Sequence, residues 1–349
     1  MRYVPINQLK PGMVLGQELY DASGHMLLGK YTKLTEDHIS YMLFIGVMGI
    51  YVDDDFSRDV QIKEIVQPEV RKKALKTIGV FFGEAAGGDI PGDESHIAEN
   101  VKNIVQGVLD NEDVMYNMIE IRTYDEYTYF HSANVAILSG VIGAKCGLSE
   151  QELSDVVTAG FLHDIGKVFI DPEIINAPRQ LTQEEKLKMK DHPTLGYEFL
   201  TKNFNFGKAV NNAVYEHHEW YNGNGYPRRL RGEEIQKISR ILKLADVYDA
   251  MTGRRSYHAP YLPSDVMEYI MARGGMEFDP AAVEIMTREL CVYPAGCEVE
   301  LSDGRHAIVI ENHRGYVLRP TVKLLDSGEY IDLCQDRDSW NLTITKLLM

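Results

Sequence analysis

The sequence of 349 residues has no apolar run long enough to cross a membrane. Its longest such run, residues 41–52, has 12 residues, whereas a membrane-spanning helix needs about 20. Residues 1–13 contain no apolar core of the kind that marks a secretory signal. These absences predict a cytoplasmic protein that does not insert into a membrane.

Cysteine is also scarce, and the cysteines that are present form no Cys-x-x-Cys pair. They are Cys146, Cys291, Cys297 and Cys334. Isolated cysteines in a chain of this length do not indicate a disulfide framework. We expect reduced thiols that mainly fill the core of a cytosolic protein.

Positive charge is in the minority. Lys and Arg number 36 against 52 Asp and Glu, which gives a formal net charge of −16 at pH 7. The acidic excess is spread along the chain, which argues against binding of DNA through bulk charge. An anionic substrate would therefore need metal ions or a few local cations. Hydrophobic residues at 44% and charged residues at 25% are typical of an ordinary globular protein.

The first 60 residues combine hairpin and helix signals. Two apolar stretches, Met13–Tyr20 and Met26–Leu34, flank a turn-forming segment. Thr35 is a suitable N-cap for a helix over Glu36–Gly46, and residues 47–52 have strand character. The pattern predicts a small α+β accessory domain over residues 1–60.

The rest of the chain is helical until a change near residue 293. Residues 61–122 predict a helical connecting segment in which a breaker-rich loop, Gly83–Asp93, joins two helices. Residues 123–292 predict an all-helical bundle. Residues 293–349 alternate, are rich in β-branched residues and predict a small β-rich module. The predicted fold class is therefore mainly α.

Histidines in the predicted bundle occupy positions where a plain core would hold apolar side chains. His131 lies at the top of an apolar helix face, although a core histidine satisfied by hydrogen bonds would look the same. His163 and Asp164 end an apolar helix, and a buried carboxylate is costly unless a cation meets it. A structural salt bridge from Asp164 to Lys167 is the alternative to a metal.

Three further ligand candidates are histidines. His192 precedes a proline and would be the N-cap of a helix that starts at Pro193. His217 and His218 project about 100° apart on a helix, so both can reach one cluster, and a metal removes the repulsion between buried protonated rings. Asp246 adds a carboxylate to an apolar helix face.

Together these residues are five imidazoles and two carboxylates. Nitrogen and oxygen donors without sulfur suit Fe, Mn or Zn. Seven ligands exceed what one ion takes while keeping an open position, so we expect two ions. Such a pair activates a nucleophile at neutral pH, and phosphoester hydrolysis is the chemistry that uses it.

The middle of the chain resembles the HD-GYP domain, a subgroup of the HD metallophosphohydrolases that degrades the bacterial second messenger cyclic di-GMP. The family motifs occur in order as Asp125-x-Tyr127-Thr128-x-x-His131-Ser132, His163-Asp164-x-Gly166-Lys167, His192-Pro193-x-x-Gly196, His217-His218-Glu219, Gly225-Tyr226-Pro227 and Ala245-Asp246-x-x-Asp249-Ala250. The resemblance implies an HD-type helical bundle over residues 123–292.

The resemblance also implies a role for each motif residue. One metal would be bound by His131, His163 and Asp246, and a second by His192, His217 and His218, with Asp164 bridging them. A hydroxide bridging the metals would attack phosphorus, giving linear pGpG and, in some family members, GMP. Divalent Fe or Mn is the preferred pair, with Zn, Ni or Mg as alternatives.

Outside the metals, Lys167 would steady the phosphoryl oxygens, and Tyr226 and Arg255 would hold the dinucleotide. His258 stands where family members commonly have a phosphate-binding lysine or arginine, which could change affinity or widen preference among cyclic dinucleotides. Tyr127 replaces the glutamate of relatives with a third metal, so two metals are favoured, although Glu126 keeps the question open.

Two other functions remain open from the sequence. One is a catalytically weak receptor or adaptor, which would bind cyclic di-GMP or a diguanylate cyclase and signal through its terminal domains. The other is an HD hydrolase for another substrate, such as a different cyclic dinucleotide. A homodimer through the helices of residues 66–121 is a further hypothesis.

Overall fold

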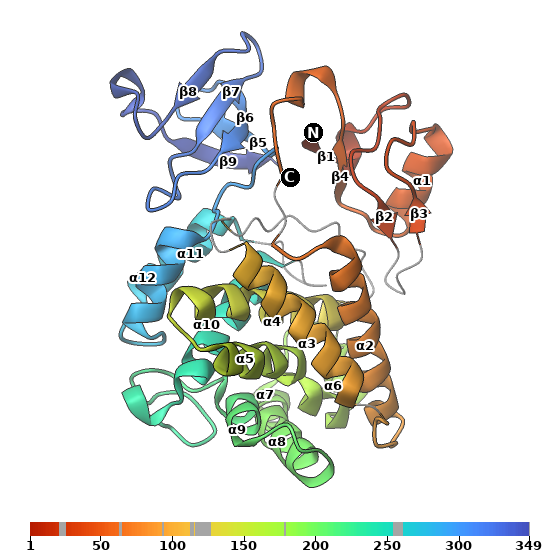
Figure 1. Cartoon of the computed structure of the whole chain (residues 1–349), viewed down its shortest axis with the longest axis vertical. Coiled ribbons are helices and arrows are strands. Elements are labelled where there is room, and N and C mark those ends of the chain that lie inside the picture. The colour runs from red at the N-terminus through yellow and green to blue at the C-terminus, as the bar shows by residue number, and fades with distance from the viewer. Residues whose placement is uncertain are drawn as a thin grey trace.

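The computed structural model describes residues 1–20, 26–62, 65–92, 94–111, 115, 127–177, 179–253 and 261–348. Figure 1 shows a helical body with two small β-containing units side by side at one end, one from each end of the chain. The predicted class, mainly α with a small α+β unit first and a β-rich module last, is confirmed. None of the helices in these ranges is long and apolar enough to span a bilayer.

The N-terminal unit is built on two short antiparallel pairings. Its elements are β1 (Arg2–Pro5), η1 (Ile6–Gln8), β2 (Leu19–Tyr20), β3 (Met26–Leu28), α1 (Glu36–Phe44), β4 (Gly49–Val52) and η2 (Asp55–Ser57). The predicted hairpin is present as β2 paired with β3, and its turn at Asp21–Gly24 lies outside the described residues. Thr35 caps α1 by accepting a hydrogen bond from the His38 N–H (3.2 Å). The pairing of β1 with β4 was not predicted.

Two long helices, α2 (Pro68–Ala86) and α3 (Glu94–Asp110), form the predicted helical connection. The break between them begins at Gly87 rather than at Gly83, so the predicted loop was too long at its start. Glu84, Ala85 and Ala86 favour helix, and Ala85 is buried against the core. Packing therefore extends the helix past the first glycine.

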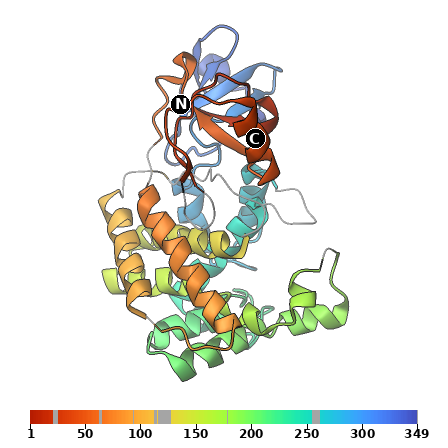
Figure 2. The same cartoon turned by 90° about the vertical axis from the view of Figure 1, so that its right-hand side faces the viewer.

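The helical body carries the predicted site residues. Its elements are α4 (Tyr127–Lys145), α5 (Glu150–Leu162), η3 (Ile165–Phe169), α6 (Pro172–Ile175), α7 (Gln183–Met189), α8 (His192–Asn203), α9 (Lys208–Glu216), η4 (Gly232–Glu234), α10 (Lys237–Thr252), α11 (Pro263–Ala272) and α12 (Pro280–Glu289). Helices α4, α5 and α10 pack on one another at its centre. Figure 2 shows α6 and α7 projecting from the side of this body.

Two glycines set the spacing of the helices that carry the site. A Cβ on Gly160 in α5 would lie 2.5 Å from Ala136 Cα in α4, so only glycine permits this approach. A Cβ on Gly166 in η3 would lie 1.9 Å from the His192 carbonyl oxygen in α8. These contacts bring the ends of α4, α5 and α8 together around one point.

The C-terminal module is a five-stranded antiparallel sheet in the order β8-β7-β6-β5-β9. Its elements are β5 (Glu298–Leu301), β6 (His306–Glu311), β7 (Thr321–Leu324), β8 (Tyr330–Asp332), η5 (Arg337–Ser339) and β9 (Ile344–Leu348). Burial alternates along β5 and β7, as expected for a sheet with one face on a core. Cys297, just before β5, is fully buried in that core.

The two β-containing units contact each other directly. The Tyr3 N–H donates to the Gly296 carbonyl (2.9 Å). Lys323 on β7 donates to the Phe56 carbonyl (2.9 Å) and lies 3.2 Å from Asp59 Oδ2. Segments from opposite ends of the sequence are thereby joined.

Candidate metal centre

The first group of buried donors joins α4 to the end of α5. His131 lies in the first turns of α4, His163 is the C-cap of α5, and Asp164 follows it. One donor atom from each of the three lies within 4.8 Å of the others. Their exposed fractions are 3%, 0% and 1%, so the donors are withdrawn from bulk water.

The second group joins α8 to the end of α9. It consists of His192, His217 and His218, again with one donor atom each within 4.8 Å of the others. His217 is the C-cap of α9 and His218 follows it. His192 is the first residue of α8, and Asp191 is its N-cap, so the prediction that His192 itself caps the helix was wrong by one residue. The imidazole nevertheless points into the cluster.

Asp164 lies between the two groups. Its Oδ2 is 3.3 Å from His163 Nε2 and its Oδ1 is 3.4 Å from His192 Nε2. Asp246 on α10 lies beside the first group, with Oδ1 3.2 Å from His131 Nε2. All seven residues that the sequence nominated as metal ligands therefore converge on one buried region.

The hydrogen bonds of three rings fit a metal at this region. The Nδ1 atoms of His163, His192 and His217 each lie 2.7–2.8 Å from the carbonyl oxygen of the residue three positions earlier. A carbonyl oxygen only accepts, so Nδ1 carries a proton, and Nε2 is the atom that a metal can bind once the ring is neutral. The Nε2 atoms of His192 and His217 face each other at 3.2 Å. Two lone pairs at this distance repel each other, and a metal ion bound to both nitrogens would remove that repulsion.

Burial keeps the second group neutral. Desolvation lowers the pKa of His192 to about 4, and it lowers the pKa values of His217 and His218 well below their usual range. Neutral imidazole is the form that binds metals. Within the described residues, Nε2 of His163 has no hydrogen-bond partner, which leaves a further donor directed at the site.

The carboxylates stay ionised in spite of their burial. Desolvation alone would raise the pKa of Asp164, but His163 and Lys167 hold it well below its usual range. Asp246 likewise has a pKa well below its usual range, because desolvation, which alone would raise it, is opposed by the hydrogen bond with His131. Desolvation alone would lower the pKa of His131, but hydrogen bonds to Asp246 and Asp249 raise it to about 9, so a metal that binds this ring must displace its proton.

Lys167 lies where the salt-bridge alternative placed it. Its Nζ is 2.5 Å from Asp164 Oδ2, and its side chain is 31% exposed. The ammonium therefore lies at the open side of the donor cluster and not within it. The same position puts a cation beside any phosphoryl group that approaches Asp164.

Asp249 is a site residue that the sequence analysis gave no role. His131 Nδ1 donates to Asp249 Oδ2 (2.7 Å), and Asn134 Nδ2 donates to Asp249 Oδ1 (3.0 Å). Asp249 is fully buried. Its spacing of three residues after Asp246 on α10 was the available signal, since that spacing places both side chains on one helix face.

The turn that carries Tyr226 is anchored by a buried carboxylate. Glu219 accepts hydrogen bonds from the Arg228 N–H (2.6 Å) and the Leu230 N–H (3.1 Å). Tyr226 stacks on His218, with ring centroids 4.8 Å apart and an interplanar angle of 19°. The predicted substrate-binding tyrosine therefore borders the second group of donors.

Two predicted substrate-binding residues, Arg255 and His258, lie outside the described residues. Glu126 and the side chain of Tyr127, on which the expectation of two rather than three metals rests, lie outside them as well.

Comparisons with known proteins agree with these motifs. The HD domain family model matches residues 113–282. A cyclic di-GMP phosphodiesterase of Pseudomonas aeruginosa is 32% identical over 236 residues, which are 68% of this chain and 57% of that protein. The 3'3'-cGAMP-specific phosphodiesterase 2 of Vibrio cholerae is 32% identical over 192 residues, 54% of this chain and 36% of that protein.

A solved structure has a similar fold. The HDG"Y"P protein Bd1817 of Bdellovibrio bacteriovorus aligns with a TM-score of 0.51 and 13% identity, covering 81% of this chain and 97% of that chain. The chain spans little more than half the length of the Pseudomonas relative and about a third of the Vibrio relative. Residues 113–282 therefore match the HD domain, and they contain every motif that resembles the HD-GYP group.

Proposed function

We propose that this protein is a metal-dependent phosphodiesterase that hydrolyses cyclic di-GMP to linear pGpG. The observation that supports this most is the arrangement around Asp164, whose two oxygens face His163 of the first donor group and His192 of the second. Relatives that share the HD domain are named as phosphodiesterases of cyclic dinucleotides. Nitrogen and oxygen donors in the two groups suit Fe, Mn or Zn, and the family resemblance puts Fe or Mn first.

The donors divide between two ions in this proposal. His131, His163 and Asp246 would hold one ion, and His192, His217 and His218 would hold the other. Asp164, which lies between the two groups, would be shared by both ions. A pair of divalent ions supplies a nucleophile at neutral pH by lowering the pKa of water, and it polarises phosphoryl oxygens.

The other residues bind and orient the substrate. Lys167, on the open side of Asp164, donates to a phosphoryl oxygen and stabilises the charge that develops there. Tyr226, held against His218 by the Glu219-anchored turn, contacts the nucleotide beside the reacting phosphate. The buried walls of the cluster keep bulk water from the reacting groups.

The test begins with metal analysis of the protein purified without oxygen, followed by chromatography of the products from cyclic di-GMP. We expect about two transition-metal ions per chain, with pGpG as the first product. Asp164→Ala should lose metal and turnover together because it removes a ligand shared by both ions. Asp155→Ala, on the same part of the chain but outside the centre, is the matched control.

The receptor and the alternative-substrate hypotheses give different results in the same assay. If the metal-loaded protein binds cyclic di-GMP tightly but forms no hydrolysis product, the receptor hypothesis replaces the hydrolase hypothesis. Faster cleavage of 3'3'-cGAMP than of cyclic di-GMP would keep the reaction and change the substrate. Full activity of Asp164→Ala with metals retained would refute the shared-ligand role.

A further inference from the structure

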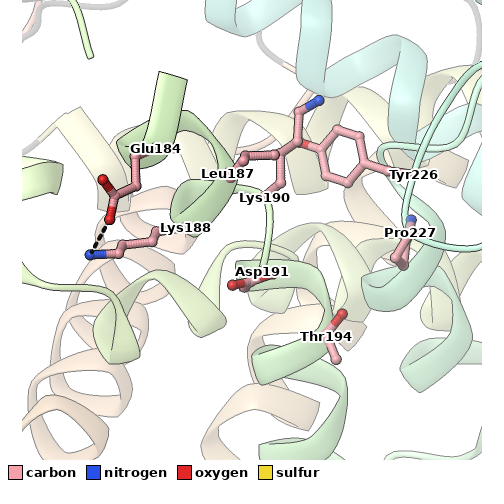
Figure 3. A pocket seen from close by; sticks show the side chains of 8 residues that line it. All are labelled: Glu184, Leu187, Lys188, Lys190, Asp191, Thr194, Tyr226 and Pro227. Carbon is pink, nitrogen blue, oxygen red and sulfur yellow. Dashed lines mark ion pairs between the residues drawn. The ribbon is translucent and has the colours of Figure 1, made fainter. Parts of the chain in front are cut away.

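A hollow lies beside the donor cluster, between α7 and the turn that carries Tyr226. Its volume is about 360 Å³, at the lower end of the size of small-molecule sites. Figure 3 shows the side chain of Lys190 beside the ring of Tyr226 at one side of it. Leu187, Asp191, Thr194 and Pro227 also line it.

The hollow and the donor cluster share one side chain. Tyr226 lines the hollow and also stacks on His218. Lys190 Nζ lies 5.1 Å from the centroid of the same tyrosine ring. A ligand that fills the hollow therefore reaches the edge of the metal centre through Tyr226.

The two lysines of the hollow, Lys188 and Lys190, differ in whether a carboxylate pairs with the ammonium group. Lys188 lies 3.7 Å from Glu184 and is paired with it. Within the part of the chain that the structure describes, Lys190 forms no ion pair. The contact with the Tyr226 ring orients its ammonium group without neutralising it, so the positive charge remains available to an anion.

We propose that this hollow binds the nucleotide of the cyclic dinucleotide that is not being cleaved, with Lys190 contacting its phosphate. This proposal rests on the proposed function. A cyclic dinucleotide carries two phosphodiesters, and the donor cluster with Lys167 neutralises only the one that reacts. In a chain with a net charge of −16, the second phosphate needs a cation of its own.

The rest of the hollow suits a purine base. Leu187 and Pro227 supply apolar surface for the ring. Asp191 presents a carboxylate, which can accept from the N1–H and the amino group of guanine together. Adenine offers no such pair of donors at that edge, so Asp191 would favour guanine.

The test compares Lys190→Met with the wild-type protein on two substrates, cyclic di-GMP and bis(p-nitrophenyl) phosphate, which lacks a second nucleotide. Loss of one charge-assisted contact should raise KM for cyclic di-GMP about ten-fold. The loss of kcat/KM on cyclic di-GMP should exceed the loss on the small diester by about the same factor. Metal content should not change, and Lys190→Arg should restore most of the affinity.

Lys202→Met, which removes an exposed lysine at the far end of α8, is the matched control and should behave as wild type. Calorimetric titration with cyclic di-GMP separates this proposal from the hydrolase proposal. Weaker binding to Lys190→Met in a protein that cleaves neither diester would keep the subsite and refute hydrolysis. Equal binding to Lys190→Met and wild type in an active enzyme would overturn the subsite alone. No binding of cyclic di-GMP to wild type would overturn both.

Discussion

At the residue scale, the sequence predicted which side chains cluster but not which groups orient them. Each nominated ligand, from His131 to Asp246, lies in the cluster. These positions could be predicted because a buried imidazole or carboxylate on an apolar face is costly unless a cation or a hydrogen-bond partner meets it. Asp249 was overlooked because its partners, His131 and Asn134, are more than 110 positions away in the sequence. Lys190 was overlooked because an exposed lysine has no sequence signal of its own.

Asp249→Asn tests the orientation of His131. The amide cannot accept from both His131 and Asn134, and an amide N–H facing His131 Nδ1 would move the ring proton to Nε2, where a metal needs a lone pair. We expect metal affinity to fall about 10- to 100-fold, measured by competition with a chelator. Asp265→Asn, on the exposed part of α11, is the control, and unchanged affinity in Asp249→Asn would contradict the role.

Lys167→Ala separates charge stabilisation from structure. In the proposed reaction, Lys167 acts on the phosphoryl oxygens and is not a metal ligand. The variant should keep its metal content and lose about 100-fold in kcat. Metal analysis and steady-state kinetics on the same preparation measure both. A normal kcat would leave only the salt bridge to Asp164 as its role.

At the scale of elements, sequence patterns predicted where helices lie along the chain but not which elements pack against one another. The Thr35 cap and the two helices around the glycine-rich break were predicted from local signals, because caps and breakers act over a few residues. The pairing of β1 with β4 depends on contacts about 50 residues apart, which no local pattern contains. The close contact of η3 with α8 at Gly166 also joins segments that are apart in the sequence, so no local pattern predicts it.

Gly166→Ala tests that contact. The added Cβ would overlap the His192 carbonyl oxygen, so η3 and α8 must separate and Asp164 must move from His192. We expect a loss of about 3 kcal/mol in the free energy of unfolding, with reduced metal content. Denaturant unfolding and metal analysis measure the two effects.

Gly83→Ala is the matched control for this change. Gly83 lies within α2, and a Cβ added there would meet no atom within 4 Å. Alanine at this position should leave stability unchanged or raise it by roughly 0.5–1 kcal/mol. An equally stable Gly166→Ala protein would show that the two elements do not need this close approach.

At the scale of the whole molecule, the two β-containing units are joined through Lys323. Its ammonium bonds the Phe56 carbonyl and Asp59, across more than 260 positions of sequence. The sequence predicted each unit separately, and the predicted boundaries at residues 60, 122 and 292 remain predictions. Nothing local indicated that the units would contact each other.

Lys323→Met should therefore destabilise the joined units while leaving the metal centre intact. We expect a loss of roughly 1 kcal/mol in the free energy of unfolding, because one partly buried ion pair and its hydrogen bond are removed. Urea unfolding measures it, with metal content as the second readout. Lys346→Met removes a more exposed ion pair, which joins Lys346 to Glu300 on the neighbouring strand of the C-terminal sheet. It should lower the free energy of unfolding by less than Lys323→Met does. An equal loss of unfolding free energy in both variants would show that the contact of Lys323 with Phe56 and Asp59 does not help to hold the two units together.

The hydrogen bond from Tyr3 to Gly296 has a consequence for biosynthesis. A ribosome adds about 5–20 residues per second, so the partner of Tyr3 emerges roughly 15–60 s after it. During that interval β1 can pair with β4 alone. The segment around Tyr3, which leaves the ribosome well before Gly296, thus completes its hydrogen bonds late in synthesis.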